Sequence, residues 1–137
     1  MNSWQLSFSS RLDYGAYDNV AIPLALSAGR ANRILMRAKL DTGSTFCVFQ
    51  RLYADLLGLE IERGLPRKIK TATGSFTAYG HEITLSVADL EWQAVVQFAE
   101  PEDFQVNVVG RVGFLDRLRI GLVDYEQLLY LGAYDEP

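Results

Sequence analysis

The sequence predicts an all-β domain, and three observations lead to this prediction. Apolar residues alternate with polar ones in several short segments, as they do in half-buried strands. Residues that favour turns separate these segments. Only two short stretches have a helical pattern. Many short strands with little helix are typical of a closed or sandwiched antiparallel β domain.

Length and composition predict one domain that covers residues 1–137. The chain has 137 residues, of which 49% are hydrophobic, and this is enough for a single core. It contains no internal repeat, linker or low-complexity tract that would divide it further.

In the first half of the chain, strands are expected where apolar side chains alternate. They alternate in residues 4–8, 20–26 and 36–40, and Arg37 and Lys39 occupy the polar face of the third segment. Leucines at helical spacing before a glycine predict a short helix over residues 50–58, QRLYADLLG.

The second half continues the strand pattern. A hairpin is expected in residues 68–78, KIKTATGSFTA, with Gly74 at its tip. Residues 82–100 predict two strands around a turn at residues 88–91. Further strands are expected in residues 104–110, 119–125 and 127–132, and a second short helix in residues 113–118, GFLDRL.

Charge and hydropathy argue against two kinds of partner. The 17 Asp and Glu residues outnumber the 13 Lys and Arg residues, and a net charge of −4 does not suit a nucleic acid. The longest uncharged apolar stretch, residues 19–29, is too short to span a bilayer, so no membrane partner is expected. The single cysteine cannot form an intramolecular disulfide, which favours a cytoplasmic location.

No metal or other cofactor is expected. Zinc sites usually use several Cys or His ligands, and this chain has one of each, Cys47 and His81. Glycine-rich phosphate loops and the G-x-S-x-G nucleophile motif are missing from the sequence. A Cys47–His81 catalytic dyad is arithmetically possible. The apolar run around Cys47 is instead typical of an inert core thiol, and His81 is expected at the surface or at a strand edge.

The segment LDTGST, residues 40–45, is the main candidate for a functional site. Asp41 follows an apolar strand, and a buried carboxylate there needs hydrogen-bond donors. Thr42, Gly43 and Ser44 offer backbone N–H groups and hydroxyls at short range. The alternative is an ordinary Asx or Ser/Thr turn that ends a strand, since turns of this composition are common.

Together with three later segments, LDTGST resembles the retropepsin-like aspartic proteases, the family of retroviral proteases and their single-domain relatives. The later segments are the helical LLGL at residues 56–59, the hairpin KTATGSF at residues 70–76 and VVGR at residues 108–111. The resemblance implies a closed antiparallel β-barrel with one or two short helices.

The resemblance also implies an aspartic endopeptidase that cuts polypeptides without a cofactor. Such enzymes activate a water between two facing carboxylates. The chain has only one Asp-Thr-Gly triplet, so the active form is expected to be a homodimer with Asp41 beside the Asp41 of its mate.

The resemblance gives each residue after Asp41 a role. Thr42 would form a hydrogen bond across the twofold axis, and Gly43 would donate its N–H. Ser44 would supply a further donor to Asp41, so Ser44→Ala is expected to move the activity optimum to higher pH.

Two other segments acquire expected roles from the resemblance. Thr73, Gly74 and Ser75 correspond to a flap tip that closes over the substrate, although an ordinary hairpin turn is the alternative. Arg111 is expected to form a structural ion pair. The residues expected to pack beside the Asp41 segment are Val108, Val109 and Gly110.

The sequence departs from the family at two places. Many relatives place Asp or Asn after the Gly-Arg pair, whereas Val112 and Gly113 follow here. Retroviral members carry an acid four residues after the catalytic Asp, where this chain has Thr45. Arg111 therefore needs a partner other than the usual one, and the dimer contacts are expected to differ in detail.

The ends of the chain leave two arrangements open. Residues 3–8 and 127–134 are candidates for strand pairing between subunits, and the alternative is that they pair within one chain. Trp4 and Trp92 are expected to be core or interface anchors.

A second function remains compatible with this reading. A catalytically inactive dimeric β module could keep the fold for binding or scaffolding. The intact segment from Asp41 to Ser44 favours the enzyme, and the altered segment after Arg111 keeps the second function open.

Overall fold

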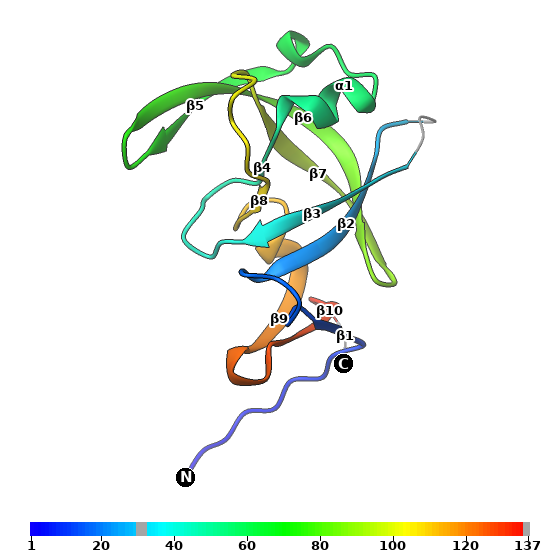
Figure 1. The fold of residues 1–137 in the computed structure, drawn as a ribbon. Coiled ribbons are helices and arrows are strands. Elements are labelled where there is room, and N and C mark those ends of the chain that lie inside the picture. The colour runs from blue at the N-terminus through cyan, green and yellow to red at the C-terminus, as the bar shows by residue number, and fades with distance from the viewer. Residues whose placement is uncertain (30–32, 136–137) are drawn as a thin grey trace.

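The computed structural model describes residues 1–29 and 33–135. In these residues the chain forms ten β-strands, one α-helix and three short 3-10 helices (Figure 1). The strands are β1 (Ser10–Asp13), β2 (Ala21–Ser27), β3 (Ile34–Leu40), β4 (Val48–Phe49), β5 (Leu65–Thr71), β6 (Gly74–Val87), β7 (Leu90–Ala99), β8 (Val108–Val109), β9 (Leu118–Val123) and β10 (Leu128–Ala133). The helices are α1 (Arg51–Leu56), η1 (Ile61–Arg63), η2 (Leu115–Arg117) and η3 (Asp124–Glu126).

The strands form two sheets. A three-stranded sheet has the order β1-β10-β9, and a seven-stranded sheet has the order β2-β3-β8-β4-β7-β6-β5. Strand β2, at one end of the larger sheet, also pairs with β6 near the other end. In Figure 1 the small sheet lies below the large one, and the β5–β6 hairpin projects at the top.

The expected architecture is correct in its β content and wrong in one detail of pairing. Most neighbouring strands are antiparallel, but β3 pairs with β8 in parallel and β4 pairs with β7 in parallel. Each parallel pair joins segments that lie far apart in the sequence, so no hairpin pattern could reveal it. Closure of the sheet into a barrel stays a prediction.

The alternation in residues 20–26 and 36–40 is confirmed as β2 and β3. Met36 and Ala38 are buried, and the intervening Arg37 and Lys39 are exposed. The strand expected at residues 4–8 is wrong, because the first strand begins at Ser10. Alternation alone does not supply a partner strand, and Trp4 is 85% exposed rather than part of the core.

Helix α1 confirms the expected helix at residues 50–58 but is shorter. Gln50 lies at its N-cap, and Gly58 follows it with a φ of +75°, a conformation that favours glycine. Ala54 and Leu57 are buried, whereas Leu52 and Leu56 are more than half exposed. The leucine spacing thus predicted the helix but not the residues that face the core.

Two hairpins follow the helix. The β5–β6 hairpin pairs Thr71 with Gly74, so its turn consists of residues 72–73 and Gly74 opens β6 instead of forming the tip. The β6–β7 hairpin turns at residues 88–89, within the expected turn, and Leu90 already belongs to β7.

The last third of the chain follows the expected order of elements. The segment at 104–110 is reduced to the two residues of β8, and the expected short helix appears as η2. Strands β9 and β10 form where strands were expected at 119–125 and 127–132.

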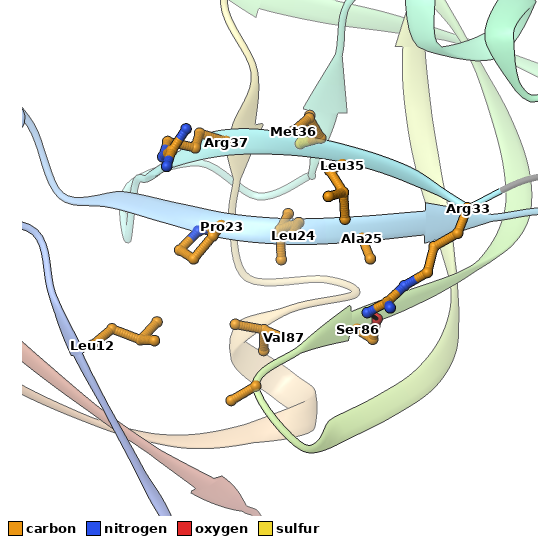
Figure 2. Close-up of a pocket in the computed structure, with 11 residues that line it drawn as sticks. Leu12, Pro23, Leu24, Ala25, Arg33, Leu35, Met36, Arg37, Ser86 and Val87 are labelled. Carbon is orange, nitrogen blue, oxygen red and sulfur yellow. Dashed lines mark hydrogen bonds between the residues drawn. The ribbon is translucent and has the colours of Figure 1, made fainter.

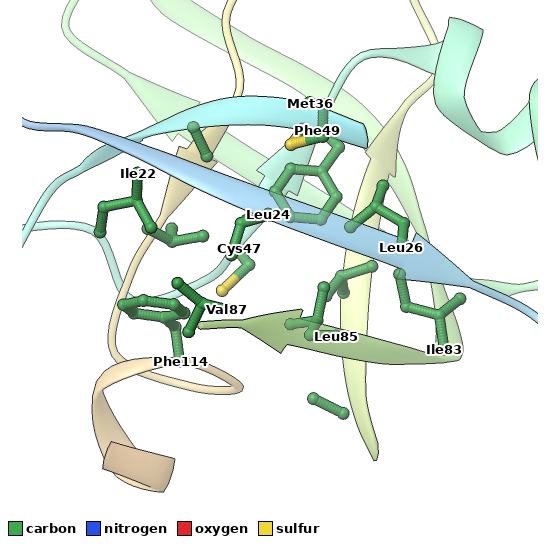
Figure 3. Close-up of a cluster of buried hydrophobic side chains, with 14 of the residues drawn as sticks. Ile22, Leu24, Leu26, Met36, Cys47, Phe49, Ile83, Leu85, Val87 and Phe114 are labelled. Atoms are coloured by element: carbon green, nitrogen blue, oxygen red, sulfur yellow. The ribbon is translucent and has the colours of Figure 1, made fainter. Parts of the chain in front are cut away.

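One hydrophobic core joins buried side chains of the large sheet, of β9 and β10 in the small sheet and of the segments between them, and Figure 3 shows part of it. Phe49 and Phe98 meet edge to face with ring centroids 6.1 Å apart. Trp92 packs on Phe114 at 5.8 Å, and its indole N–H donates to the carbonyl oxygen of Gly113 at 2.8 Å. Trp92 is therefore a core anchor, as expected. The labelled core residues are Ile22, Leu24, Leu26, Met36, Cys47, Phe49, Ile83, Leu85, Val87 and Phe114.

The small sheet is built within one chain. Strand β1 pairs with β10 in the register Ser10 to Leu131, and β10 pairs with β9. The Phe8 ring lies 5.8 Å from the Tyr130 ring, at the start of the segment that leads away from the sheet. Residues 1–6 extend away from the body of the molecule (Figure 1). The C-terminal strand thus pairs inside the chain, and residues 3–8 form no strand there.

Candidate active site

The backbone of β8 fixes the position of Asp41. Strands β3 and β8 run in parallel, with Leu40 opposite Val109. Directly after β3, the N–H of Asp41 donates to the carbonyl oxygen of Val109 at 3.0 Å. We call residues 41–46 the Asp41 loop. The hydrogen bond of Asp41 thus continues the parallel pairing of β3 with β8 by one residue.

The loop holds the Asp41 carboxylate through its own backbone. The N–H of Gly43 donates to Asp41 Oδ1 at 3.0 Å, and the N–H of Ser44 donates to the carbonyl oxygen of Asp41 at 3.1 Å. Asp41 is half-buried, while Thr42 and Gly43 are exposed. The carboxylate is thus oriented by a backbone donor and keeps a side open to solvent or to another molecule.

The hydroxyl of Ser44 does not have its expected partner. Ser44 Oγ donates to the carbonyl oxygen of Phe46 at 2.7 Å, so its one proton is not directed at Asp41. This bond fastens the far end of the Asp41 loop. The expected support for the carboxylate comes instead from the N–H of Gly43.

This geometry changes the expected effect of Ser44→Ala. The variant should lower the free energy of unfolding by about 1 kcal/mol, because a partly buried carbonyl loses its donor. It should leave the pH optimum of activity unchanged. Urea unfolding and a pH–activity profile measure the two effects, with Ser44→Thr as the control that keeps a hydroxyl. An upward shift of the optimum would show that Ser44 donates to Asp41 in the active form.

The segment after β8 packs directly under the Asp41 loop. The N–H groups of Arg111 and Val112 donate to the carbonyl oxygens of Ser44 and Thr45 at 2.9 and 2.8 Å. A Cβ on Gly110 would lie 2.4 Å from the carbonyl oxygen of Ser44, so only glycine fits here. Val109 is fully buried and Val108 is partly buried. These contacts place Val108, Val109 and Gly110 beside the loop, where the sequence analysis expected them.

A pocket of about 300 Å³ lies between the Asp41 loop and β5. Figure 1 shows the loop after β3 below the β5–β6 hairpin. The guanidinium carbon of Arg67, on β5, lies 4.3 Å from the centroid of the Phe46 ring, so the hairpin and the loop are in contact. The lining residues are Gly43, Ser44, Thr45, Phe46, Val48, Lys68, Ile69 and Lys70.

The expected flap residues lie farther along the same hairpin. Thr73, Gly74 and Ser75 are exposed, and none of them lines the pocket beside the Asp41 loop. The sequence analysis missed Arg67, Lys68 and Lys70, although the basic residues around Ile69 were a visible signal.

Two solved structures that resemble this chain are aspartic proteases. A retropepsin-like aspartic protease from Rickettsia conorii superimposes with a TM-score of 0.65 at 15% identity, over 90% of this chain and 99% of that chain. The EIAV protease in complex with the inhibitor HBY-793 superimposes with a TM-score of 0.56 at 16% identity, over 73% of this chain and 88% of that one. This chain has a retropepsin-like fold. No protein-family model and no curated protein matches the sequence.

Arg111 departs from expectation within this retropepsin-like fold. Its side chain is exposed and forms no ion pair with any residue in 1–29 and 33–135. The nearby Asp116 instead accepts the N–H of Gly113 at 2.9 Å and lies 3.7 Å from Arg117. The expected ion pair of Arg111 is therefore wrong for the single chain.

Cys47 and His81 do not form a dyad. Cys47 Sγ accepts the N–H of Gly110 at 3.5 Å and lies 3.5 Å from the carbonyl oxygen of Val112. His81 lies in the middle of β6, half-buried, and its Nε2 bonds to the carbonyl oxygen of Ile61 at 2.8 Å. His81 is thus neither fully exposed nor fully buried, and the expected inert thiol agrees with the burial of Cys47.

Cys47 should react slowly with thiol reagents in the folded protein. Burial raises the pKa of the Cys47 thiol from 9.0 to about 11, and the Gly110 N–H offsets this only in part. At pH 8 the native protein should therefore react at least about a hundredfold more slowly than the chain unfolded in guanidinium. A thiol-reagent assay at equal protein concentrations measures both rates, and equal rates would contradict the buried thiol. The stability that this thiol contributes is present below pH 9 and is lost as pH rises towards 11.

A second, larger pocket of about 430 Å³ lies away from the Asp41 loop (Figure 2). It opens between β2, β3 and the β6–β7 turn, and mainly apolar side chains line it. At one end the Arg33 guanidinium donates to Ser86 Oγ at 3.3 Å. It shares no lining residue with the Asp41 loop and takes no part in the candidate active site.

The described residues contain neither a cluster of metal ligands nor a membrane-spanning helix. In the parts of the chain described, no three His, Cys, Asp or Glu side chains cluster as a metal site requires. None of the helices in the same residues has the length and hydropathy needed to cross a membrane.

Proposed function

We propose that this chain is a homodimeric aspartic endopeptidase. The observation that carries the proposal is the placement of Asp41 at the end of β3, with its carboxylate held by the N–H of Gly43 beside a pocket under the β5–β6 hairpin. The retropepsin-like fold supports the same conclusion. Water is the nucleophile, and no cofactor takes part.

The proposed chemistry needs two carboxylates that share one proton. One Asp41 acts as the general base that takes a proton from water, and the other protonates the oxygen of the scissile carbonyl. Because the chain has one Asp-Thr-Gly triplet, the second Asp41 comes from a second copy. The exposed hydroxyl of Thr42 is available for a hydrogen bond across the twofold axis.

The proposed substrate is a polypeptide bound in an extended conformation. Strand β5 lies at the end of the large sheet, so its outer edge can pair with a peptide strand. Thr73, Gly74 and Ser75, at the exposed end of this hairpin, then close over the peptide and exclude water. The pocket beneath β5 accepts a peptide side chain.

The proposed dimer also explains the exposed N-terminal residues. Trp4 and Leu6 are 85% and 62% exposed in a segment that pairs with no strand of its own chain. Covering them with a second copy would remove apolar surface from water. Sedimentation analysis at micromolar concentration should therefore find a dimer, and replacing Trp4 and Leu6 with serine should weaken it.

Digestion of a mixed peptide library tests the proposed activity. The library is incubated with the wild type and with Asp41→Asn from about pH 3 to 7.5, a range that covers a shared-proton pair. Mass spectrometry should find products only with the wild type, and these products also give the side-chain preferences around the cut. A folded, dimeric wild type that cuts no peptide would exclude general peptidase activity.

A catalytically inactive, dimeric binding or scaffold module is the second candidate function. The exposed Arg111, which has no ion pair in the described residues, favours it because the charges expected around the dimer contact are altered. A measurement of oligomeric state can exclude the peptidase but cannot exclude the binding module. A strictly monomeric protein cannot assemble the two carboxylates, whereas a dimer is compatible with both functions.

A further inference from the structure

The pocket beside the Asp41 loop carries positive charge on a protein that is acidic as a whole. The net charge is −4, yet Lys68 and Lys70 both line this pocket. The chain has only three lysines, and the third, Lys39, lies on β3 two residues before Asp41. All three lysines therefore lie on the two strands that border the Asp41 loop.

No carboxylate in the part of the chain that the structure describes forms an ion pair with these lysines. The lining of the pocket contains no Asp or Glu. Across the described ranges 1–29 and 33–135, the ion pairs engage Arg51, Arg63 and Arg117, and none engages a lysine. Lys68 and Lys70 are exposed, so their ammonium groups are open to a ligand.

A third cation strengthens the positive charge along β5. The Arg67 guanidinium stacks over the ring of Phe46, which itself lines the pocket. Strand β5 thus presents positive charge on both of its faces, since Arg67 alternates with Lys68 and Lys70. An anionic side chain bound in the pocket would meet the two lysines of its lining and no opposing carboxylate there.

We propose that this pocket selects peptides with Asp or Glu close to the scissile bond. The proposal rests on the proposed peptidase function and adds its substrate class. Gly43 belongs both to the pocket and to the hydrogen bond that orients Asp41, so the pocket adjoins the reacting carboxylate. A peptide with an acidic side chain within a few residues of the cut therefore reaches Lys68 and Lys70.

Paired peptides that differ only in Glu against Gln measure the preference. Glu is placed at each position from four residues before to four residues after a cut found in the library. At the favoured position, kcat/KM for the Glu peptide should exceed that for the Gln peptide about fivefold, as expected for exposed charge pairs. Raising NaCl from about 0.05 M to 1 M should largely remove this ratio.

Variants assign the preference to the lysines. Replacing both residues, Lys68→Gln with Lys70→Gln, should bring the Glu-to-Gln ratio close to one. The double charge reversal, Lys68→Glu with Lys70→Glu, should favour a Lys peptide over the Glu peptide. Arg63→Gln is the control for loss of a positive charge elsewhere on the surface, because Arg63 pairs with Glu60 and does not line the pocket. It should keep the wild-type ratio.

A binding assay separates failure of this proposal from failure of the peptidase function. Asp41→Asn cannot hydrolyse a peptide, so fluorescence anisotropy can compare labelled Glu and Gln peptides on the intact site. Tighter binding of the Glu peptide, lost in the double Lys→Gln variant, would support acidic selection even if the wild type cuts nothing. Equal binding and equal cleavage of the two peptides, or no binding of either, would overturn the proposal. Cleavage without acidic preference would leave the peptidase function standing alone.

Discussion

Asp41→Asn is expected to lower kcat/KM for peptide hydrolysis by about a thousandfold or more. The amide cannot take a proton from water and cannot protonate a carbonyl oxygen, so both roles of the proposed pair are lost at once. In a homodimer a single substitution alters both carboxylates. The measurement is kcat/KM on one peptide selected from the library, at the pH where the wild type is most active.

The structure predicts that Asp41→Asn remains folded. Asparagine has the shape of aspartate and keeps an oxygen that can accept the Gly43 N–H, which donates at 3.0 Å in the wild type. The circular dichroism spectrum, the urea midpoint and the sedimentation coefficient should therefore match those of the wild type. Unchanged cleavage by this folded variant would remove Asp41 from the mechanism and would contradict the proposed aspartic chemistry.

Gly110→Ala is expected to lower the free energy of unfolding by about 3 kcal/mol. An added Cβ would lie 2.4 Å from the carbonyl oxygen of Ser44 and 2.6 Å from that of Phe46. Both atoms belong to the backbone, so the Asp41 loop would have to move away from β8. Loss of the contact between Arg111 N and Ser44 O, 2.9 Å in the wild type, would follow.

Gly58→Ala is the matched control for this stability measurement. Gly58 has a φ of +75°, and no atom lies within 4 Å of an added Cβ. Alanine there should lower the free energy of unfolding by about 1 kcal/mol, because its backbone disfavours a positive φ. Urea unfolding should rank Gly110→Ala well below Gly58→Ala in stability. The Gly110 variant should also lose activity while it is still folded. The opposite ranking would show that the Asp41 loop can move away from β8 at little cost in stability.

Local patterns predicted the elements whose partners lie nearby in the sequence. The alternation in β3 identified Met36 and Ala38 as buried, and glycine after leucines identified α1. The strand expected around Trp4 failed because alternation describes one face of a strand and says nothing about a neighbour that would cover it. The parallel pairs β3–β8 and β4–β7 lay beyond any local pattern.

The candidate site was predictable in its residues and less so in its contacts. The Asp-Thr-Gly triplet located Asp41 and its donor, the N–H of Gly43. A backbone N–H two residues after an aspartate lies within reach of its carboxylate, so this contact could be expected from the sequence. The Ser44 hydroxyl can rotate, and in the structure it donates to the carbonyl oxygen of Phe46. The sequence alone could not show that this acceptor would be preferred to the Asp41 carboxylate. The contact between Arg67 and Phe46 joins residues from two elements, so it required the folded structure.

The support of Asp41 by β8 has a consequence for the order in which the protein folds. The acceptor for the Asp41 N–H belongs to Val109, so the contact closes a loop of more than sixty residues. Contacts between such distant parts of a chain form slowly and late. During synthesis, Asp41 leaves the ribosome long before Val109. A nascent chain therefore carries the Asp-Thr-Gly triplet without this backbone acceptor until Val109 has been added.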